Sequence, residues 1–170
     1  MPKTTVFIAG SRAISRLNDT IRKRIDNIVL EGHDVVVGDA NGADRMVQQY
    51  LADKGYQRVV VYCTGARCRN NVGAWPTVAV APPAGVHGGF EFYAAKDQQM
   101  AEAATHGLML WDGESRGTLA NVKNLLAAKK PSVVYLSPLK KFLTVRSTDD
   151  LGNLLETVGP FALEGVKRRA

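Results

Sequence analysis

Short apolar runs alternate with amphipathic stretches along most of this chain, and that alternation is the strongest constraint on its fold. The runs TVFIAG (5–10), DVVVGD (34–39) and RVVVYC (58–63) are separated by helical patterns at 15–32 and 42–55. Nearly continuous apolar runs of this length are typical of parallel strands that helices cover on both faces. The order therefore predicts a doubly wound sheet with right-handed crossovers.

The rest of the chain continues the same pattern. A third helix is expected from about Gly89 to His106, then a strand (107–113), a helix (118–130), a strand (132–137), and a short strand and helix whose N-cap is Ser147 or Thr148. We expect one domain over 1–170, of class α/β: a Rossmann-like, doubly wound, mainly parallel sheet of five to six strands with helices on both faces. Its core spans 4–137, and a strand–helix extension spans 140–160.

Composition limits the kinds of partner. The longest apolar runs are far shorter than the roughly 20 residues that cross a bilayer, so no membrane association is expected. The only cysteines, Cys63 and Cys68, have no metal-site spacing, which favours two free thiols in a reducing cytoplasm, no metal and no cofactor. The formal charge of +6 falls partly in the tail 167–169 and is otherwise scattered, so a nucleic-acid partner is only weakly indicated.

Three turns that follow predicted strands are rich in glycine and small polar residues, and the first and third of them also carry hydroxyl groups and arginine. They comprise Gly10, Ser11 and Arg12; then Gly38, Asn41, Gly42, Ala43 and Asp44; and then Asp112, Gly113, Ser115, Arg116, Gly117 and Thr118. Ligands of open parallel sheets bind beyond the carboxyl ends of the strands, where helix N-termini supply free N–H groups. Each turn alone has the composition of an ordinary strand-to-helix connection, but the three together predict a phosphate-binding rim.

The segments AGSR, GDANGAD, KDQQM and LWDGESRGT together resemble the SLOG superfamily, the Rossmann-like group that includes the DprA/Smf proteins and the Lonely-guy phosphoribohydrolases. The similarity is greatest to small domains of unknown function with GSR, GxAxGAD and WDGxSxGT turns. It implies a nucleotide-derived ligand with Gly10, Ser11 and Arg12 near one end of the site and Gly38, Gly42, Ala43 and Asp44 along its middle. Gly113, Ser115, Gly117 and Thr118 would receive the phosphate. It also implies self-association into a homo-oligomer.

The sequence departs from the Lonely-guy pattern at the residues that matter for catalysis. The turn reads DGESRGT instead of PGGxGT, and Asn121 stands where the catalytic glutamate is expected. Asparagine cannot exchange a proton as a carboxylate does, which argues against hydrolysis by that route. Asp97, on the expected buried face of the third helix, and Glu91 and Asp44 are the alternative catalytic carboxylates.

Several of these side chains have a plainer interpretation. Asp97 could pair with a neighbouring cation, and Lys96 could contact phosphate or remain a solvated surface lysine. His87 is a weaker acid–base candidate. Trp111 is expected in the core, and Tyr93 either there or stacked on a base. The Gly- and Pro-rich segment 64–89 is too long for an ordinary connection and is interpreted as a binding loop or lid, interrupted only by a candidate short strand at Thr77–Ala81.

Three functions follow, in order of preference. The first is binding or sensing of a nucleotide or nucleoside phosphate at the strand ends. The second is cleavage or transfer at the N-glycosidic bond of a nucleotide, as in phosphoribohydrolases and deoxyribosyltransferases. The third is a DprA-like nucleic-acid-binding module.

Overall fold

The computed structural model describes the backbone of residues 3–169 and the side chains of residues 3–159. Its strands are β1 (Thr5–Gly10), β2 (Asp34–Gly38), β3 (Val59–Thr64), β4 (Thr77–Val80), β5 (His106–Trp111), β6 (Ser132–Leu136) and β7 (Lys141–Val145). Its helices are α1 (Asp19–Leu30), α2 (Ala43–Asp53), α3 (Gly89–Ala103), α4 (Arg116–Ala127) and α5 (Thr148–Arg169).

The strands form one sheet in the order β4-β3-β2-β1-β5-β6-β7. All neighbouring pairs are parallel except β6 and β7, which are antiparallel. The expected doubly wound, mainly parallel α/β class is confirmed. The sheet has seven strands where five to six were expected, because the short segment Thr77–Val80 pairs in register with β3 and extends the edge.

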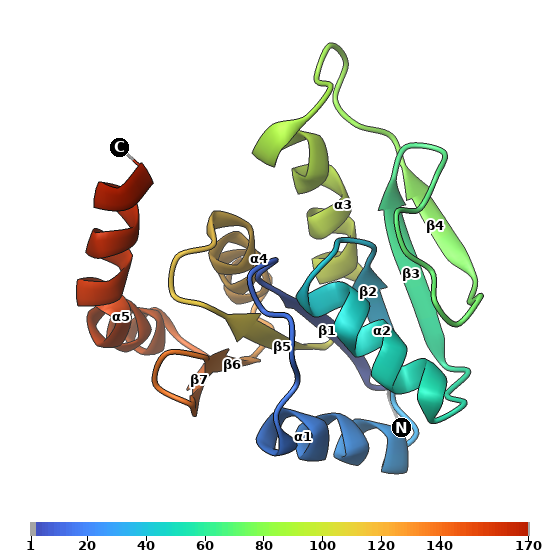
Figure 1. Ribbon diagram of the computed structural model, residues 1–170, viewed down its shortest axis with the longest axis horizontal. Coiled ribbons are helices and arrows are strands. Elements are labelled where there is room, and N and C mark those ends of the chain that lie inside the picture. Colours follow the sequence, from blue (N-terminus) through green and yellow to red (C-terminus); the bar gives the residue numbers. More distant parts are fainter. Residues whose placement is uncertain (1–2, 170) are drawn as a thin grey trace.

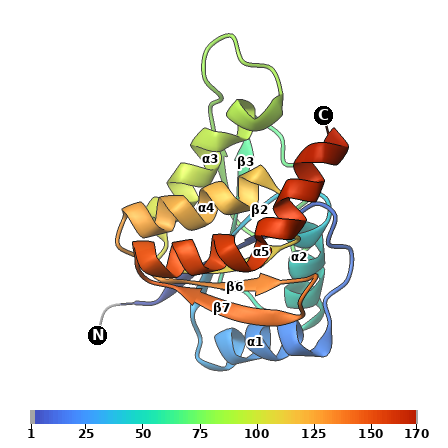
Figure 2. The ribbon, with the colours of Figure 1, turned by 90° about the vertical axis from the view of Figure 1, so that its left-hand side faces the viewer.

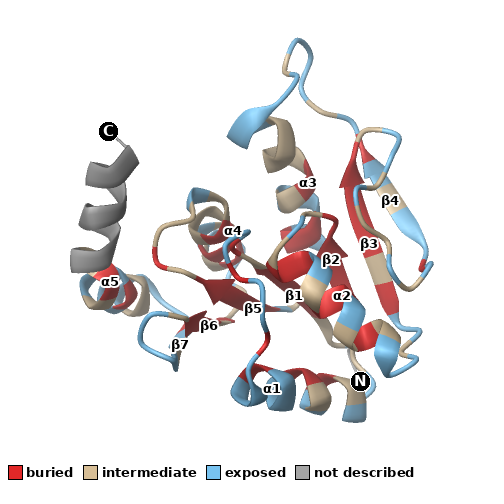
Figure 3. Cartoon of the chain, viewed as in Figure 1, coloured by how far each residue is buried: buried red, intermediate tan, exposed pale blue. Residues whose placement is uncertain are grey.

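Helices cover both faces of the sheet (Figures 1 and 2), and two buried clusters fill the layers between them. Under α1 and α2, residues such as Ile25 and Leu51 pack on Ile8 and Val37. Under α3, α4 and α5, residues such as Met100 and Leu125 pack on Phe7 and Met109. The central strands are accordingly buried along most of their length (Figure 3).

Helices α3 and α4 each end three residues before the predicted boundary, and α4 begins two residues earlier, while α1 and α5 differ more. Helix α1 begins at Asp19, not near residue 15, because Asn18 is the N-cap and its side chain accepts a hydrogen bond from Ile21 N at 2.9 Å. Helix α5 continues to Arg169, past the expected end at 160. Of its two proposed N-caps, Ser147 serves, since its hydroxyl accepts from Asp150 N at 3.1 Å.

The expectation of two free thiols is wrong, because Cys63 and Cys68 are joined in a disulfide with their Cα atoms 5.1 Å apart. Sequence spacing could not reveal this pairing, since it depends on how the segment after β3 folds back on the strand. Within the described residues, no helix combines the length and the apolar character that a membrane crossing requires.

The order of the strands creates a topological switch point. From β1 the chain proceeds outward through β2, β3 and β4, and then crosses to the opposite side of β1 to form β5. The segments that follow β1 and β5 consequently lead to helices on opposite faces of the sheet, and a crevice opens between them at the carboxyl ends of the strands.

Candidate functional site

A cavity of about 540 Å³ occupies the crevice over the ends of β1, β2 and β5, between α2, α3 and α4. The residues that line it come from all the elements that converge there: Ala9, Gly10, Arg12, Ala13, Ala40, Asp44, Arg69, Gly89, Phe90, Tyr93, Lys96, Asp97, Met100, Asp112, Ser115, Arg116, Gly117, Thr118 and Asn121. This volume lies within the range of about 300–1,000 Å³ that is usual for small-molecule sites. Four of the lining side chains are cationic and three are carboxylic, so the lining is mixed with an excess of positive charge.

Two glycines allow the close packing of the β1 turn against α2. A Cβ on Gly10 would lie 2.6 Å from Ala43 Cβ and 2.6 Å from the carbonyl oxygen of Leu110. Gly42 has a φ of 83°, and a Cβ there would collide with the backbone of Arg12. Both positions therefore need glycine for the local backbone fold, whether or not a ligand is bound.

Ser11 ties the β1 turn to the β5 turn from beneath the cavity. Its side chain is buried; its hydroxyl accepts from Asp112 N at 3.1 Å and lies 3.4 Å from the hydroxyl oxygen of Thr118. Thr118 Oγ1 in turn donates to Ser115 Oγ at 3.1 Å. This chain of hydroxyl groups fixes the spacing of the two turns, and Ser11 itself does not line the cavity.

The N-terminus of α4 faces the cavity, and part of its hydrogen-bonding capacity is already used. Asp112 Oδ1 accepts from the N–H groups of Glu114 and Ser115, both at 2.9 Å. Ser115 is the N-cap, and its hydroxyl accepts from Thr118 N at 3.3 Å. The first-turn N–H groups of Arg116 and Gly117 have no hydrogen-bond partner among the described residues. These two groups, together with the Arg116 side chain, are thus available to an anion.

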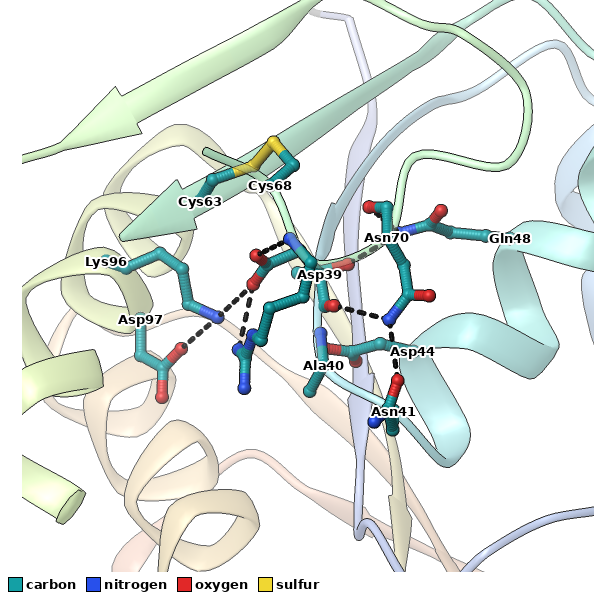
Figure 4. Close-up of polar contacts among 12 residues, drawn as sticks. Asp39, Ala40, Asn41, Asp44, Gln48, Cys63, Cys68, Asn70, Lys96 and Asp97 are labelled. Atoms are coloured by element: carbon teal, nitrogen blue, oxygen red, sulfur yellow. Dashed lines mark hydrogen bonds and ion pairs between the residues drawn. A yellow bond between two sulfur atoms is a disulfide. The ribbon is translucent and has the colours of Figure 1, made fainter. Parts of the chain in front are cut away.

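Beyond the ends of β2 and β3, a second polar cluster centres on Asp39, which is 1% exposed (Figure 4). Its carboxylate accepts from the backbone N–H and from Nη2 of Arg69, both at 2.8 Å. Burial alone would raise the pKa of Asp39, but the two hydrogen bonds from Arg69, with help from Lys96, lower it below its ordinary value. Asp39 is therefore a firmly ionised anchor that places Arg69 at the cavity.

Lys96 is the most deeply buried cation of the site, with a side chain 4% exposed. Its Nζ lies 3.6 Å from Asp39 Oδ1 and 3.8 Å from Asp97 Oδ1, distances of ion pairs but not of hydrogen bonds. An ammonium group at a cavity wall whose N–H donors are unused is able to donate a hydrogen bond to an acceptor atom of a ligand.

Asp44 and Asp97 are the carboxyl groups with raised proton affinity. Burial raises the pKa of each to about 6, with the charge of Lys96 opposing the rise in both. Asp44 Oδ2 accepts from Ala40 N at 3.1 Å, and Asp44 Oδ1 is buried without a partner in the described structure. Carboxyl groups with pKa values near 6 can hold or release a proton close to neutral pH, as acid–base chemistry requires.

Two aromatic rings complete the lining. The guanidinium of Arg69 lies 4.3 Å from the ring centre of Tyr93, and Arg12 and Lys96 lie near the same ring at 5.8 and 5.6 Å. Arg116 lies 4.6 Å from the ring centre of Phe90 at the N-terminus of α3. The cations are consequently held beside π-faces, and contact with an aromatic surface lowers the cost of placing them in a partly buried site.

The structure brings most of the predicted site residues to this one cavity: Gly10, Arg12, Asp44, Lys96, Asp97, Asp112, Ser115, Arg116, Gly117 and Thr118. The remaining ones lie close to it but outside its lining: Ser11, Gly38, Asn41, Gly42, Ala43, Gly113 and Glu91. Asn41 is at the surface, where it accepts from Asn70 at 2.9 Å, and Glu91 is exposed in the first turn of α3.

Three expectations about single side chains have an outcome. Lys96 is not a solvated surface residue, because α3 borders a polar cavity and the aliphatic part of the Lys96 side chain extends inward to Asp39. Asp97 keeps 19% of its side chain exposed and so is less buried than the helical period suggested. Trp111 is in the core as expected, 2% exposed, and its indole N–H donates to the Ser115 carbonyl at 3.0 Å.

Sequence reasoning missed Arg69, the residue that connects the β2 and β3 ends. It lies after β3 in the segment 64–89, which was interpreted as a binding loop or lid but from which only His87 was selected, as a weaker acid–base candidate. The sequence did contain a signal for Arg69. A polar segment that follows a third adjacent parallel strand must begin at the edge of the sheet where the other strands end, which is where the site was expected.

One group of described residues has the atoms of a metal site. Asp39, Cys63 and Cys68 place ligand atoms within 4.8 Å of one another. The sulfur atoms are bonded together and Asp39 is held by two hydrogen bonds from Arg69, so this group does not fit a cation in its present form.

Comparison with known proteins supports the fold. No protein-family profile matches the chain, and neither does any curated protein sequence. A solved structure of DNA processing protein A from Helicobacter pylori, a protein that binds single-stranded DNA, matches with a TM-score of 0.60. The match covers 97% of this chain and 81% of that chain at 14% sequence identity. At this identity the similarity establishes that the two proteins share a Rossmann-like α/β fold.

Proposed function

We propose that the cavity binds the phosphate and sugar of a nucleotide. The observation that carries the proposal is the pair of unpartnered N–H groups at Arg116 and Gly117, which lie at a helix N-terminus beside a cavity of nucleotide size. Arg12 and Arg116 also line the cavity and add guanidinium groups, which are well suited to phosphate oxygens. The phosphate is held there, and the sugar lies toward Asp44, Lys96 and Asp97.

The location within the fold supports the same proposal. The cavity lies at the switch point between β1 and β5, the place where open parallel sheets bind nucleotides. The β5 turn is held in shape by Asp112, Ser115 and Ser11 through hydrogen bonds that involve no ligand. A site ordered in advance loses little conformational entropy when it binds.

Thermal-shift and calorimetric titrations with nucleoside mono- and diphosphates test the proposal. Specific binding to the folded state must raise the melting temperature as nucleotide is added. Arg116→Met is expected to weaken binding about tenfold to a hundredfold, the usual cost of a lost charged hydrogen bond. Arg146→Met is the matched control, since it removes the same charge after β7, away from the cavity. If no nucleotide stabilises the protein, or if both variants lose affinity equally, the proposal fails.

The same incubations examine hydrolysis of the N-glycosidic bond. Asp44 and Asp97, whose pKa values are about 6, are the carboxyl groups available for it. Release of free base that disappears in Asp97→Asn and Asp44→Asn would assign an enzyme activity to the cavity. Release that persists in both variants would exclude these residues as its catalytic groups.

The second candidate is binding of single-stranded nucleic acid. The specific observation in its favour is the shared fold with a protein that binds single-stranded DNA, a comparison that supports this candidate better than a small-molecule ligand. The rim of the cavity also carries Arg116 beside Phe90 and Arg12 near Tyr93, the combination of cation and aromatic ring that strand-binding surfaces use.

Fluorescence anisotropy with a labelled oligothymidylate, and with a duplex as comparison, tests this candidate. Affinity for the single strand should fall steeply with salt and should be weaker in Arg116→Met than in Arg146→Met. Competition by a mononucleotide would place the strand in the cavity. Equal affinity for the duplex, or equal losses in both variants, would refute strand binding at this site.

A further inference from the structure

The disulfide lies directly beside the residue that connects the two halves of the site. Cys63 is in β3 and is 1% exposed, and Cys68 immediately precedes Arg69. Arg69 donates twice to Asp39, lies over the Tyr93 ring and lines the cavity. The disulfide lies beside Asp39 (Figure 4) and ties Cys68 to β3. It therefore anchors the residue that directly precedes Arg69.

Little else holds the segment that the disulfide closes. Between the two cysteines, Gly65 donates its N–H to Val80 O at 2.9 Å, and Ala66 and Arg67 are exposed and make no hydrogen bond in the described structure. A cross-link over so short a segment removes much of its conformational freedom. Without the cross-link, this segment is the part of the loop that gains alternative conformations.

The rest of the loop is attached independently of the disulfide. Asn70 donates to the carbonyl oxygen of Asp39 at 2.8 Å, and Val72 N donates to Gln48 Oε1 at 2.9 Å. Gln48 in turn donates to Gly38 O at 2.9 Å. Thr64 is held in β3 by its pairing with Val80, and Arg69 keeps its two hydrogen bonds to Asp39. Loss of the disulfide would therefore loosen residues 65–68, which leaves Asp39 as the anchor of Arg69 while the loop beyond stays on α2. This is a local change and not unfolding.

We propose that Cys63 and Cys68 form a reversible thiol–disulfide site whose oxidised form holds Arg69 in the cavity. The consequence for ligand affinity rests on the proposed function, whereas the consequence for the loop does not. The reductant is a dithiol. Cys68 is partly exposed and Cys63 is buried, so Cys68 Sγ is the atom that an incoming thiolate reaches.

The electrons and protons balance in two steps. A thiolate of the reductant attacks Cys68 Sγ, the bond between the two protein sulfur atoms breaks, and Cys63 leaves as a thiolate. The second thiol of the reductant then attacks its own sulfur in the mixed disulfide and releases Cys68. Two electrons and two protons pass from the dithiol to the two cysteines, and the reductant ends as a cyclic disulfide. Both sulfur atoms lie within 4.8 Å of a carboxylate oxygen of Asp39, the residue to which Arg69 donates.

Limited trypsin digestion of oxidised and dithiothreitol-treated protein tests the loop directly. Reduction is expected to speed cleavage after the exposed Arg67 by about tenfold or more, the fold-change that corresponds to the conformational freedom regained. The double variant Cys63→Ser/Cys68→Ser should be cut at the fast rate with or without reductant. Unchanged cleavage after complete reduction, verified by alkylation of both thiols, would overturn the proposal, as would free thiols in air-exposed protein or a failure of dithiothreitol to reduce the pair.

Titration with inorganic phosphate and a nucleoside monophosphate tests the effect on the site. Affinity is expected to fall at least severalfold on reduction and to return on reoxidation, and the serine double variant should not respond. Faster cleavage with unchanged affinity would overturn the link between the disulfide and the cavity. If oxidised protein binds neither probe, the proposed function fails, and the digestion result alone decides whether the redox site exists.

Discussion

Replacement of Asp44 by asparagine should make the protein more stable at neutral pH, although it removes a charge that faces Lys96. The carboxyl group is buried, and burial raises its pKa from 3.8 to about 6. Between these two pH values the folded protein holds this proton more tightly than the unfolded chain does. The contribution of Asp44 to the free energy of unfolding therefore falls as the pH rises from about 4 to 6, and it stays low above that.

The structure sets the size of the effect. One unit of pKa corresponds to about 1.36 kcal/mol, so a rise from 3.8 to about 6 amounts to about 3 kcal/mol at pH 7. Asparagine keeps the acceptor for Ala40 N and introduces no ionisable group. Asp44→Asn is consequently expected to gain up to about 3 kcal/mol over the native protein at pH 7.5 and almost nothing at pH 4.

Urea unfolding at a series of pH values measures this difference. Asp19→Asn is the matched control, because the Asp19 side chain is 100% exposed, and its curve should follow that of the native protein. A stability of Asp44→Asn below that of the native protein at pH 7.5 would contradict the cost assigned to the buried charge. A difference between the two proteins that does not change between pH 4 and 7.5 would contradict it equally.

Four further substitutions test the packing of the site by urea unfolding. Gly10→Ala should cost about 2 kcal/mol or more, because its methyl group meets Ala43 and the Leu110 carbonyl, while Gly117→Ala, which has open space, should cost nothing. Ser115→Ala should cost about 1 kcal/mol through loss of the α4 N-cap; a neutral result would mean that Asp112 caps the helix alone. Arg69→Met should cost about 2 kcal/mol at neutral pH, since it removes a charged hydrogen bond from buried Asp39. Because Arg69 lowers the pKa of Asp39, that cost should shrink as the pH falls below 4, and a constant cost would contradict the assignment.

The sequence predicted the fold because its strands are specified locally. Runs such as VVV in β2 are buried on both faces, and a helical period is unmistakable in Ile21, Ile25 and Ile28 of α1. Edges carry weaker signals. Strand β4 is half exposed, so Thr77–Val80 reads ambiguously, and only its pairing with β3 makes it a strand.

The site was predictable to the extent that it depends on strand ends. Gly10, Arg12, Ser115 and Thr118 could be placed near one another because parallel strands end at one edge. Arg69 and the buried state of Lys96 depend on long-range contacts with Asp39, which no local pattern encodes. The disulfide likewise results from the path of a loop. Self-association, a cytoplasmic location and the roles of the individual site residues stay predictions.

The C-terminal part of the chain offers a way to separate loss of folding from loss of function. Strand β7 and helix α5 bury Val145, Leu154 and Val158 against the sheet layer, and none of their side chains up to residue 159 lines the cavity. Random mutagenesis, scored for both protein abundance and ligand retention, should therefore give different effects in different parts of the chain. Substitutions in this part would deplete the protein itself, while those around Arg116 and Lys96 would leave its amount intact and abolish retention.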